Sequence, residues 1–366
     1  MKKDEDRNMT IRELAARCNL SISSVSRAMN NPPETAQMTQ ETYKRVHDIA
    51  EKFGYRPNFY AKAFFKKTSN CIGFIHGTAL NYVGVPLLEG LSDVFDQHDM
   101  TVALSSTHDE VARETEAFDR MFYRNVDAII YLPAIRKGKY TIGHLKKLWK
   151  DNPEHPPVLS LLGGVMVPGM FQLCMKDAEA SREAALRQLQ LGCRKFGIVN
   201  SPFTSPAGDS AIEAYRNTLL KNGIPSQEIN EVRIWHTFPH EKLELLRDID
   251  GLWVIDHLLI PECHHALSRL CDLKKLHIDT VSTIENETLL QWLQVDMNFT
   301  RSITEHYGSL NIFHYSSYQI GAKAAEMIMK IIEQPSSAPY SCELDWNQSD
   351  FISQENKSSR YCYCKS

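Results

Sequence analysis

The sequence lacks any uninterrupted apolar stretch close to the about 20 residues that a membrane helix needs. Its first residues, MKKDEDRNMT, are charged and no apolar segment follows them, so we expect no secretory signal and no membrane partner. The nine cysteines are an odd number scattered along the chain, which suits free thiols better than a disulfide framework. These absences predict a cytoplasmic protein.

Signatures of catalysis are also missing. The sequence has no GxGxxG after a strand, no phosphate-binding GxxxxGK and no GxSxG nucleophile motif. Cys263, His264 and His265 are adjacent, which spreads their side chains instead of converging them on one ion, and the final CYC lacks partners at zinc-finger spacing. We therefore expect no enzyme, no catalytic residue, no cofactor and no metal site.

Positive charge is concentrated at one end of the chain. Residues 1–69 hold 13 Lys and Arg against 8 Asp and Glu, a net +5, whereas the remaining residues hold 28 against 37, a net −9. The whole chain is therefore only weakly acidic, at −4. A surface that binds a polyanion is expected in the N-terminal segment.

From residue 71 onward, short apolar runs alternate with longer amphipathic segments, the pattern of parallel sheets covered by helices on both faces. About 290 residues exceed what one such sheet usually holds, so we expect two α/β lobes of doubly wound parallel sheet with a ligand cleft between them. The expected strands are 71–77, 101–106, 127–133, 158–164, 171–175, 195–201, 232–238, 251–257 and 278–284.

The N-terminal segment has a different pattern, with three short helices and no strand. Thr10 can cap the first helix, and Glu13 completes a capping box. Asn19 suits a tight turn because Asn tolerates the left-handed conformation. Ser21 can cap a second helix, and Thr39 a third after a Pro-containing loop. This order predicts an all-α helix-turn-helix headpiece.

These segments resemble a known family. The runs TIRELAARCNLSISSVSRAMN, TQETYKRVHDIAEKFGYRPN and AKAFFKKTSNCIGFI resemble the headpiece, hinge and first core strand of the LacI family of bacterial transcription regulators. MKDAEASREAALRQLQLGCRKFGIV and YQIGAKAAEMIMKII resemble its periplasmic-binding-protein-like regulatory domain. Between Asn30 and Thr39 this sequence carries a few extra residues, which lengthen the loop after the second helix.

The resemblance implies a headpiece, a hinge and a two-lobe core. We expect these boundaries: headpiece 1–57; hinge helix and linker 58–70; N-terminal lobe 71–163 plus about 312–336; C-terminal lobe 164–311 plus about 337–355; tail 356–366.

By resemblance, the side chains that contact DNA base edges lie at the start of the second helix, at Ile22 and Ser23, with Arg27 a turn later. Arg27 can contact guanine, Ser23 can donate or accept, and Ile22 can pack on a thymine methyl. The alternative is a solvated polar helix face with Arg27 in a surface ion pair. Hydroxyl and amide side chains around these helices are the expected phosphate contacts, namely Thr10, Ser21, Ser24, Ser26, Asn30 and Thr39.

The hinge, residues 58–67, is too short to be a stable helix alone, so we expect it to form on DNA. Asn58 would cap it, and by resemblance Phe64, with Ala61 on the same face, would enter the minor groove. Lys62, Lys66 and Lys67 would neutralise phosphates. The alternative makes Phe64 a packing contact between headpiece and core.

The resemblance also implies an effector between the lobes, often a sugar or a nucleobase. Asp256, Asp177 and Tyr215 are the expected effector contacts. Ala211 stands where sugar-binding members carry Arg, and Ala178 replaces the Asn that usually follows the aspartate. A sugar site therefore cannot be carried over, and an unusual ligand or none stays open, as does a helix-capping role for Asp256.

Together these observations predict a DNA-binding transcription regulator, a repressor, that binds a pseudo-palindromic double-stranded operator as a homodimer, with a tetramer left open. A small-molecule effector, such as a carbohydrate, would change its affinity. An effector-independent repressor and a solute-binding protein are the alternatives.

Overall fold

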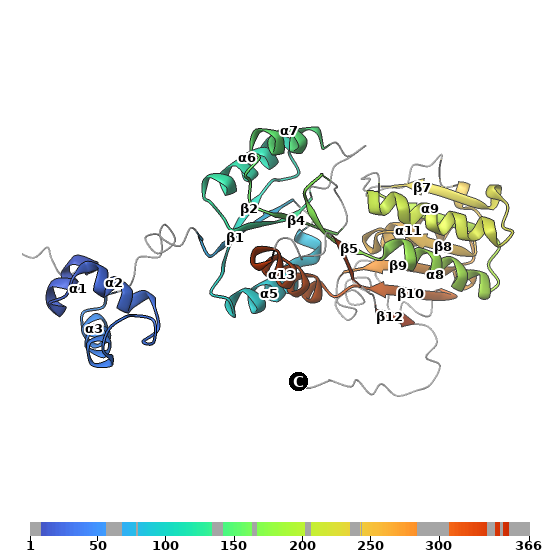
Figure 1. Cartoon of the computed structure of the whole chain (residues 1–366). Helices are drawn as coiled ribbons and strands as arrows, with labels where there is room; N and C mark the ends of the chain where they lie inside the picture. Colours follow the sequence, from blue (N-terminus) through green and yellow to red (C-terminus); the bar gives the residue numbers. More distant parts are fainter. Residues whose placement is uncertain are drawn as a thin grey trace, which may run out of the picture. The chain divides into compact units, whose positions relative to one another are not determined.

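The computed structural model describes residues 9–55, 68–77, 80–133, 142–162, 167–201, 206–234, 242, 244–283, 307–334, 341–344 and 347–350. The chain divides into two compact units, residues 1–70 and 71–366. Among the described residues, the first unit carries helices only, and the second carries two sheets with helices around them (Figure 1).

The headpiece is a bundle of three short helices, α1 (Ile11–Cys18), α2 (Ile22–Asn30) and α3 (Gln40–Lys52). Its expected caps are confirmed: Thr10 and Glu13 form a capping box, and Ser21 and Thr39 accept backbone N–H groups. Asn19 adopts the left-handed conformation at φ 54°. The helices pack on a small apolar core formed by Leu14, Ala15, Cys18, Val25, Ala28, Val46 and Ala50.

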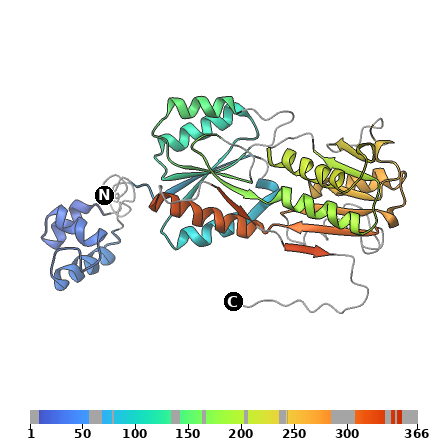
Figure 2. The ribbon, with the colours of Figure 1, turned by 45° about the vertical axis from the view of Figure 1, so that its right-hand side comes forward.

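The first lobe of the larger unit is built on a six-stranded parallel sheet of order β11-β5-β4-β3-β1-β2. Its strands are β1 (Cys71–His76), β2 (Thr101–Ser106), β3 (Ala128–Leu132), β4 (Val158–Leu161), β5 (Phe171–Met175) and β11 (Ser341–Leu344). Its helices are α5 (Leu80–Asp96, kinked at Gly84), α6 (Val111–Tyr123), α7 (Gly143–Asp151) and α13 (Ser317–Glu333). As Figure 2 shows, α6 and α7 cover one face of this sheet, and α5 and α13 the other.

The second lobe has a six-stranded sheet of order β12-β10-β9-β8-β6-β7, parallel except for β12 against β10. Its strands are β6 (Phe196–Asn200), β7 (Ile229–Arg233), β8 (Gly251–Val254), β9 (His277–Ser282), β10 (Ser309–His314) and β12 (Asn347–Asp350). Its helices are α8 (Asp177–Gln190), α9 (Pro206–Lys221) and α11 (Ile260–Leu267). Alternate residues of one strand serve opposite faces, since Trp253 packs under α8 and α9 whereas Leu252 and Val254 pack under α11. The expected α/β fold with two parallel-sheet lobes is confirmed.

Three expected lobe boundaries are wrong. Residues 164–175 do not start the second lobe, because β5 pairs with β4 in the first sheet. Residues 312–314 belong to β10 of the second sheet, and β11 lies in the first sheet although residues 337–355 were assigned to the second lobe. The chain crosses between lobes after β5, after β10 and between β11 and β12. Hydropathy identifies a strand but not its pairing partner, which explains these errors. A smaller error concerns the strand expected at 232–238: β7 begins at Ile229 and ends at Arg233.

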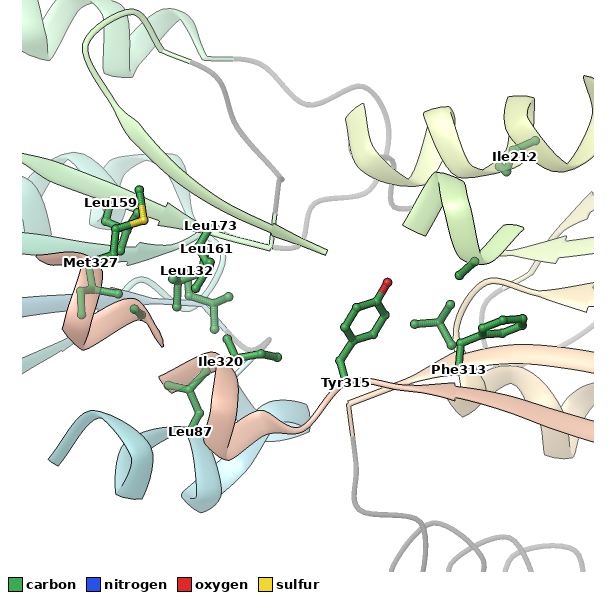
Figure 3. Close-up of a cluster of buried hydrophobic side chains, with 14 of the residues drawn as sticks. Leu87, Leu132, Leu159, Leu161, Leu173, Ile212, Phe313, Tyr315, Ile320 and Met327 are labelled. Carbon is green, nitrogen blue, oxygen red and sulfur yellow. The ribbon is translucent and has the colours of Figure 1, made fainter. Parts of the chain in front are cut away.

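One crossing passes through Tyr315, which lies between β10 and α13 and is almost fully buried. Figure 3 shows its hydroxyl directed into the region between the lobes. Beyond it, α13 approaches α5 so closely that a Cβ at Gly321 would collide with the Leu87 carbonyl, and one at Gly90 with the Tyr318 carbonyl. The crossing segment at Tyr315 therefore leads directly into a tightly packed helix pair, α13 against α5.

Candidate nucleic-acid interface and interlobe cavity

The second headpiece helix, α2, presents the side chains expected to contact bases. Ile22 is 46% exposed although it is apolar, and Ser23 and Arg27 are exposed. Ser23 and Arg27 are four residues apart and share one helix face. Val25 and Ala28 are fully buried on the opposite side, where they hold α2 against the other two helices. The headpiece thus offers a polar helix face with an exposed apolar residue at its N-terminal end.

The expected phosphate contacts are largely engaged in local hydrogen bonds. The Thr10 hydroxyl donates to Glu13 Oε2 at 2.9 Å, and the Thr39 hydroxyl donates to Thr42 at 2.9 Å. Asn30 Nδ2 donates to the Ser26 carbonyl at 2.8 Å.

The serines at the start of α2 are likewise engaged in local hydrogen bonds. Ser21 Oγ accepts from Ser24 N at 3.1 Å and lies 2.8 Å from Ser23 Oγ and 2.9 Å from Ser24 Oγ. The backbone N–H groups of the first turn of a helix have no intrahelical partner, and they point toward the same end as these hydroxyls. The N-terminus of α2 is accordingly suited to an anion.

Arg27 is held by a residue that the sequence analysis did not single out. Its Nη1 donates to Oε1 of Gln37 at 2.9 Å. In the part of the chain that the structure describes, Arg27 makes no ion pair with a carboxylate. The only sequence signal for Gln37 was its place in the lengthened loop. The positions expected in the hinge, Asn58, Ala61, Lys62, Phe64, Lys66 and Lys67, lie outside the described residues.

A cavity of about 250 Å³ lies between the two lobes. Leu162 and Met175 line it from the first lobe. The second lobe contributes the polar wall, which consists of Asp177, Asn200, Ser201, Asp256, His257, Ser282 and Thr283, and Trp253 also borders it. Asp177 and Asp256 were both expected here, and the structure brings them to the same cavity.

Asp177 is the first residue of α8, and burial raises the pKa of its carboxyl to about 6. An interaction with the Tyr315 hydroxyl opposes this shift. Its Oδ1 is buried and accepts no hydrogen bond from any residue that the structure describes. The Nε1 of Trp253, a fully buried side chain, likewise donates to no residue that the structure describes. Neither of these two buried atoms has a partner at hydrogen-bond distance among the described residues, and a buried polar atom without one is costly.

Asp256 caps a helix, which was its alternative expected role, and it also lines the cavity. It accepts the backbone N–H of Leu258 at 3.0 Å and so caps the short 3₁₀ helix His257–Leu259. His257 beside it is buried, and its Nδ1 lies 3.3 Å from the Val281 carbonyl oxygen. Burial lowers the pKa of His257, against the opposing charge of Asp256.

Tyr215 was expected to contact an effector, but the structure places it away from the cavity. Its side chain is fully buried and does not line the cavity. Its hydroxyl donates to Gln188 Oε1, and its ring stacks on Trp253 with centroids 6.0 Å apart. Tyr215 faces the sheet from α9, whereas Ala211, one turn earlier, borders the cavity. Trp253 borders the cavity instead. It lies in the apolar strand β8, and its sequence context did not indicate this position.

A buried polar network supports this wall from behind. Asp279 is fully buried and accepts from Gln188 Nε2 at 2.7 Å, from Asn311 Nδ2 at 2.8 Å and from Arg187 Nη1 at 3.3 Å. Gln188 in turn accepts from Tyr215, on whose ring Trp253 stacks. The network thereby fixes the orientation of the indole.

The described residues hold neither a metal-binding cluster nor a membrane-spanning helix. No group of three or more His, Cys, Asp or Glu side chains there is arranged to hold a metal ion. No helix among them combines the length and apolar character needed to cross a membrane.

The headpiece geometry agrees with a sequence comparison. The profile of the bacterial regulatory proteins of the lacI family matches residues 10–58, which include α1, α2 and α3. Residues 10–58 therefore match the helix-turn-helix domain of that family. Within this domain, α1 and α2 are the helix-turn-helix.

The chain is 24% identical over 223 residues to catabolite control protein A of Priestia megaterium, an alignment covering 60% of this chain. The match spans 64% of that relative's length. Over 94% of this chain and 98% of the other, the structure is similar to the lac repressor dimer bound to operator and the anti-inducer ONPF, with a TM-score of 0.71 and 13% identity. It is also similar to the transcriptional regulator CelR in complex with cellobiose, with a TM-score of 0.59, 14% identity and 93% and 98% coverage. At these identities the structural matches establish the fold alone.

Proposed function

We propose that this protein is a sequence-specific transcription regulator, a repressor, whose headpiece binds duplex DNA and whose core responds to a small ligand. The observation that carries the proposal is the capped, exposed face of α2 in a LacI-family domain, with Ile22, Ser23 and Arg27 accessible together. Residues at the N-terminal part of such a helix face base edges in the major groove.

The protein acts as a homodimer on a pseudo-palindromic operator. One headpiece contacts few base pairs and neutralises few phosphates, so useful specificity requires two copies at half-sites one helical turn apart. The similarity to a lac repressor dimer on its operator supports this arrangement.

The cavity between the lobes receives the ligand. Its described wall offers the carboxylates of Asp177 and Asp256 as acceptors, and no Lys or Arg of the described residues lines it. Such a wall suits a neutral polyhydroxylated or amine-bearing molecule and disfavours a phosphorylated one. The CelR relative binds cellobiose, a neutral sugar. A ligand that bridges the lobes would shift the population of their arrangements and thereby change DNA affinity.

A gel-shift or anisotropy titration with duplexes selected by the full chain tests the DNA-binding part. Arg27→Ala should weaken the preferred duplex by about 1–3 kcal/mol and relax the preference at one base pair. An equal loss on all duplexes would make Arg27 a phosphate contact. A wild-type protein without any preferred duplex would refute the proposal.

An effector-independent repressor is the second candidate, and Ala211 at the cavity, where an Arg was expected for a sugar site, favours it. Thermal-shift measurements with neutral sugars, amino sugars, nucleosides and sugar phosphates separate the two. Stabilisation by at least one ligand supports a regulated protein, because a ligand of the folded state stabilises it by mass action. No stabilisation by any of them supports the second candidate.

A further inference from the structure

The loop between α2 and α3, residues 31–38, is folded onto the headpiece. The backbone N–H and the Nδ2 of Asn31 both donate to the Arg27 carbonyl, at 3.1 and 3.0 Å. The Pro32 carbonyl accepts from the N–H groups of Thr35 and Ala36, both at 3.0 Å, which closes a turn. Ala36 is then fully buried. The residues between α2 and α3 thus form an ordered turn anchored at both ends.

This turn determines where Gln37 lies. Buried Ala36 precedes it, and Thr39, the cap of α3, follows two residues later. Between these fixed points Gln37 adopts φ 53°, in the left-handed region that side chains other than Gly rarely occupy. Such a conformation persists when the surroundings determine it, and it is concentrated at functional sites. Here it directs the exposed Gln37 side chain to Arg27, 2.9 Å away.

We propose that Gln37 is a specificity-determining positioning residue, which orients the Arg27 guanidinium for one base edge before DNA arrives. This inference rests on the proposed DNA-binding function. An arginine has five N–H donors, and Gln37 takes one of them, which leaves enough for a two-bond contact with guanine O6 and N7. A guanidinium already held in place loses less side-chain entropy on binding, which favours the matched base.

The chemistry of glutamine matters in this role. A neutral amide oxygen restrains the guanidinium without neutralising it, so Arg27 keeps its full charge for the DNA. A carboxylate at the same position would bind Arg27 as an ion pair and repel the phosphates. The two substitutions Gln37→Ala and Gln37→Glu therefore separate orientation from charge.

The test uses the full chain and the duplex that it selects from a random library. Dissociation constants are measured for that duplex, for each of its single-base-pair variants and for an unrelated duplex, at several salt concentrations. Pro33→Ala, an exposed position in the same turn, is the matched control.

Gln37→Ala should weaken the selected duplex about tenfold, the loss typical of one specific base contact. The loss of preference should fall on the base pair that Arg27→Ala also affects, and the double variant should bind no more weakly than Arg27→Ala alone. Affinity for the unrelated duplex, its salt dependence and the melting temperature should not change. Gln37→Glu should weaken all duplexes, and Pro33→Ala none.

Two results would overturn the inference: Gln37→Ala leaving every preference intact, or its effect adding to that of Arg27→Ala. A wild-type chain that selects no duplex would instead refute the proposed function itself. The two failures are thus distinguishable.

Discussion

Asp177→Asn should stabilise the folded protein at pH 8 and leave its stability near pH 4 almost unchanged. Asn keeps the shape of Asp but carries no charge, and the carboxyl of Asp177 lies at the cavity with Oδ1 buried and unbonded in the described structure. The substitution therefore removes a charge from a site that solvates it poorly.

The magnitude follows from the pKa. Burial raises the pKa of Asp177 from 3.8 to about 6, and a shift of about two units corresponds to about 3 kcal/mol. Asp177 as a residue is only partly buried, and it lies in the first turn of α8, whose dipole favours a negative charge by about 0.3–1 kcal/mol. Both effects reduce the cost of ionisation, so we expect a gain of about 1–2 kcal/mol for Asp177→Asn.

The sign of the pH dependence is fixed by the same shift. The folded state holds the proton more tightly than the unfolded chain, so the contribution of Asp177 to stability is fully present below the unfolded pKa of 3.8. It is lost as the pH rises through the folded pKa of about 6. Urea unfolding of both proteins at intervals from pH 5 to 8 should show the difference growing with pH. A variant that is equally or less stable than the wild type at pH 8 would refute this reasoning.

Three other substitutions give sharp expectations. Thr39→Ala removes the cap of α3 and should lower the stability of the headpiece by about 1 kcal/mol, measured by hydrogen exchange of the α3 amides; unchanged exchange would contradict the capping role. Asp279→Ala leaves Arg187 without its buried carboxylate and should lower the free energy of unfolding by about 3–5 kcal/mol in urea, whereas a loss below 1 kcal/mol would show that solvent reaches the network. Asp256→Ala removes a partly exposed carboxylate that lines the cavity, so any ligand found by thermal shift should bind about 1 kcal/mol more weakly in calorimetry, and unchanged affinity would place the ligand elsewhere.

The headpiece could be predicted from sequence because its signals are local. A cap, its partner three residues later and a left-handed Asn all lie within one turn of each other, and Thr10, Glu13 and Asn19 behave as expected. The position of Gln37 could not be predicted in this way. It depends on the burial of Ala36 and on the turn closed by the Pro32 carbonyl, which only the folded loop shows.

In the core, the alternation of strands and helices could be predicted from the sequence, but the assignment of each strand to a lobe could not. β5 and β11 pair across about 170 residues of sequence, and no local pattern encodes such a partner. The cavity shows the same limit. Asp177 and Asp256 follow strands, where ligand groups are expected, and both line the cavity. Tyr215 does not line it, because the direction of its side chain depends on how α9 packs on the sheet.

The central claim is that the exposed face of α2 recognises a duplex sequence. The most direct test measures the fluorescence anisotropy of the full chain on its selected duplex and on a scrambled duplex of equal composition, at moderate salt. The account predicts at least about a thousandfold preference for the selected duplex, lost in large part when Arg27 is replaced by Ala. Equal affinity for the two duplexes would contradict it.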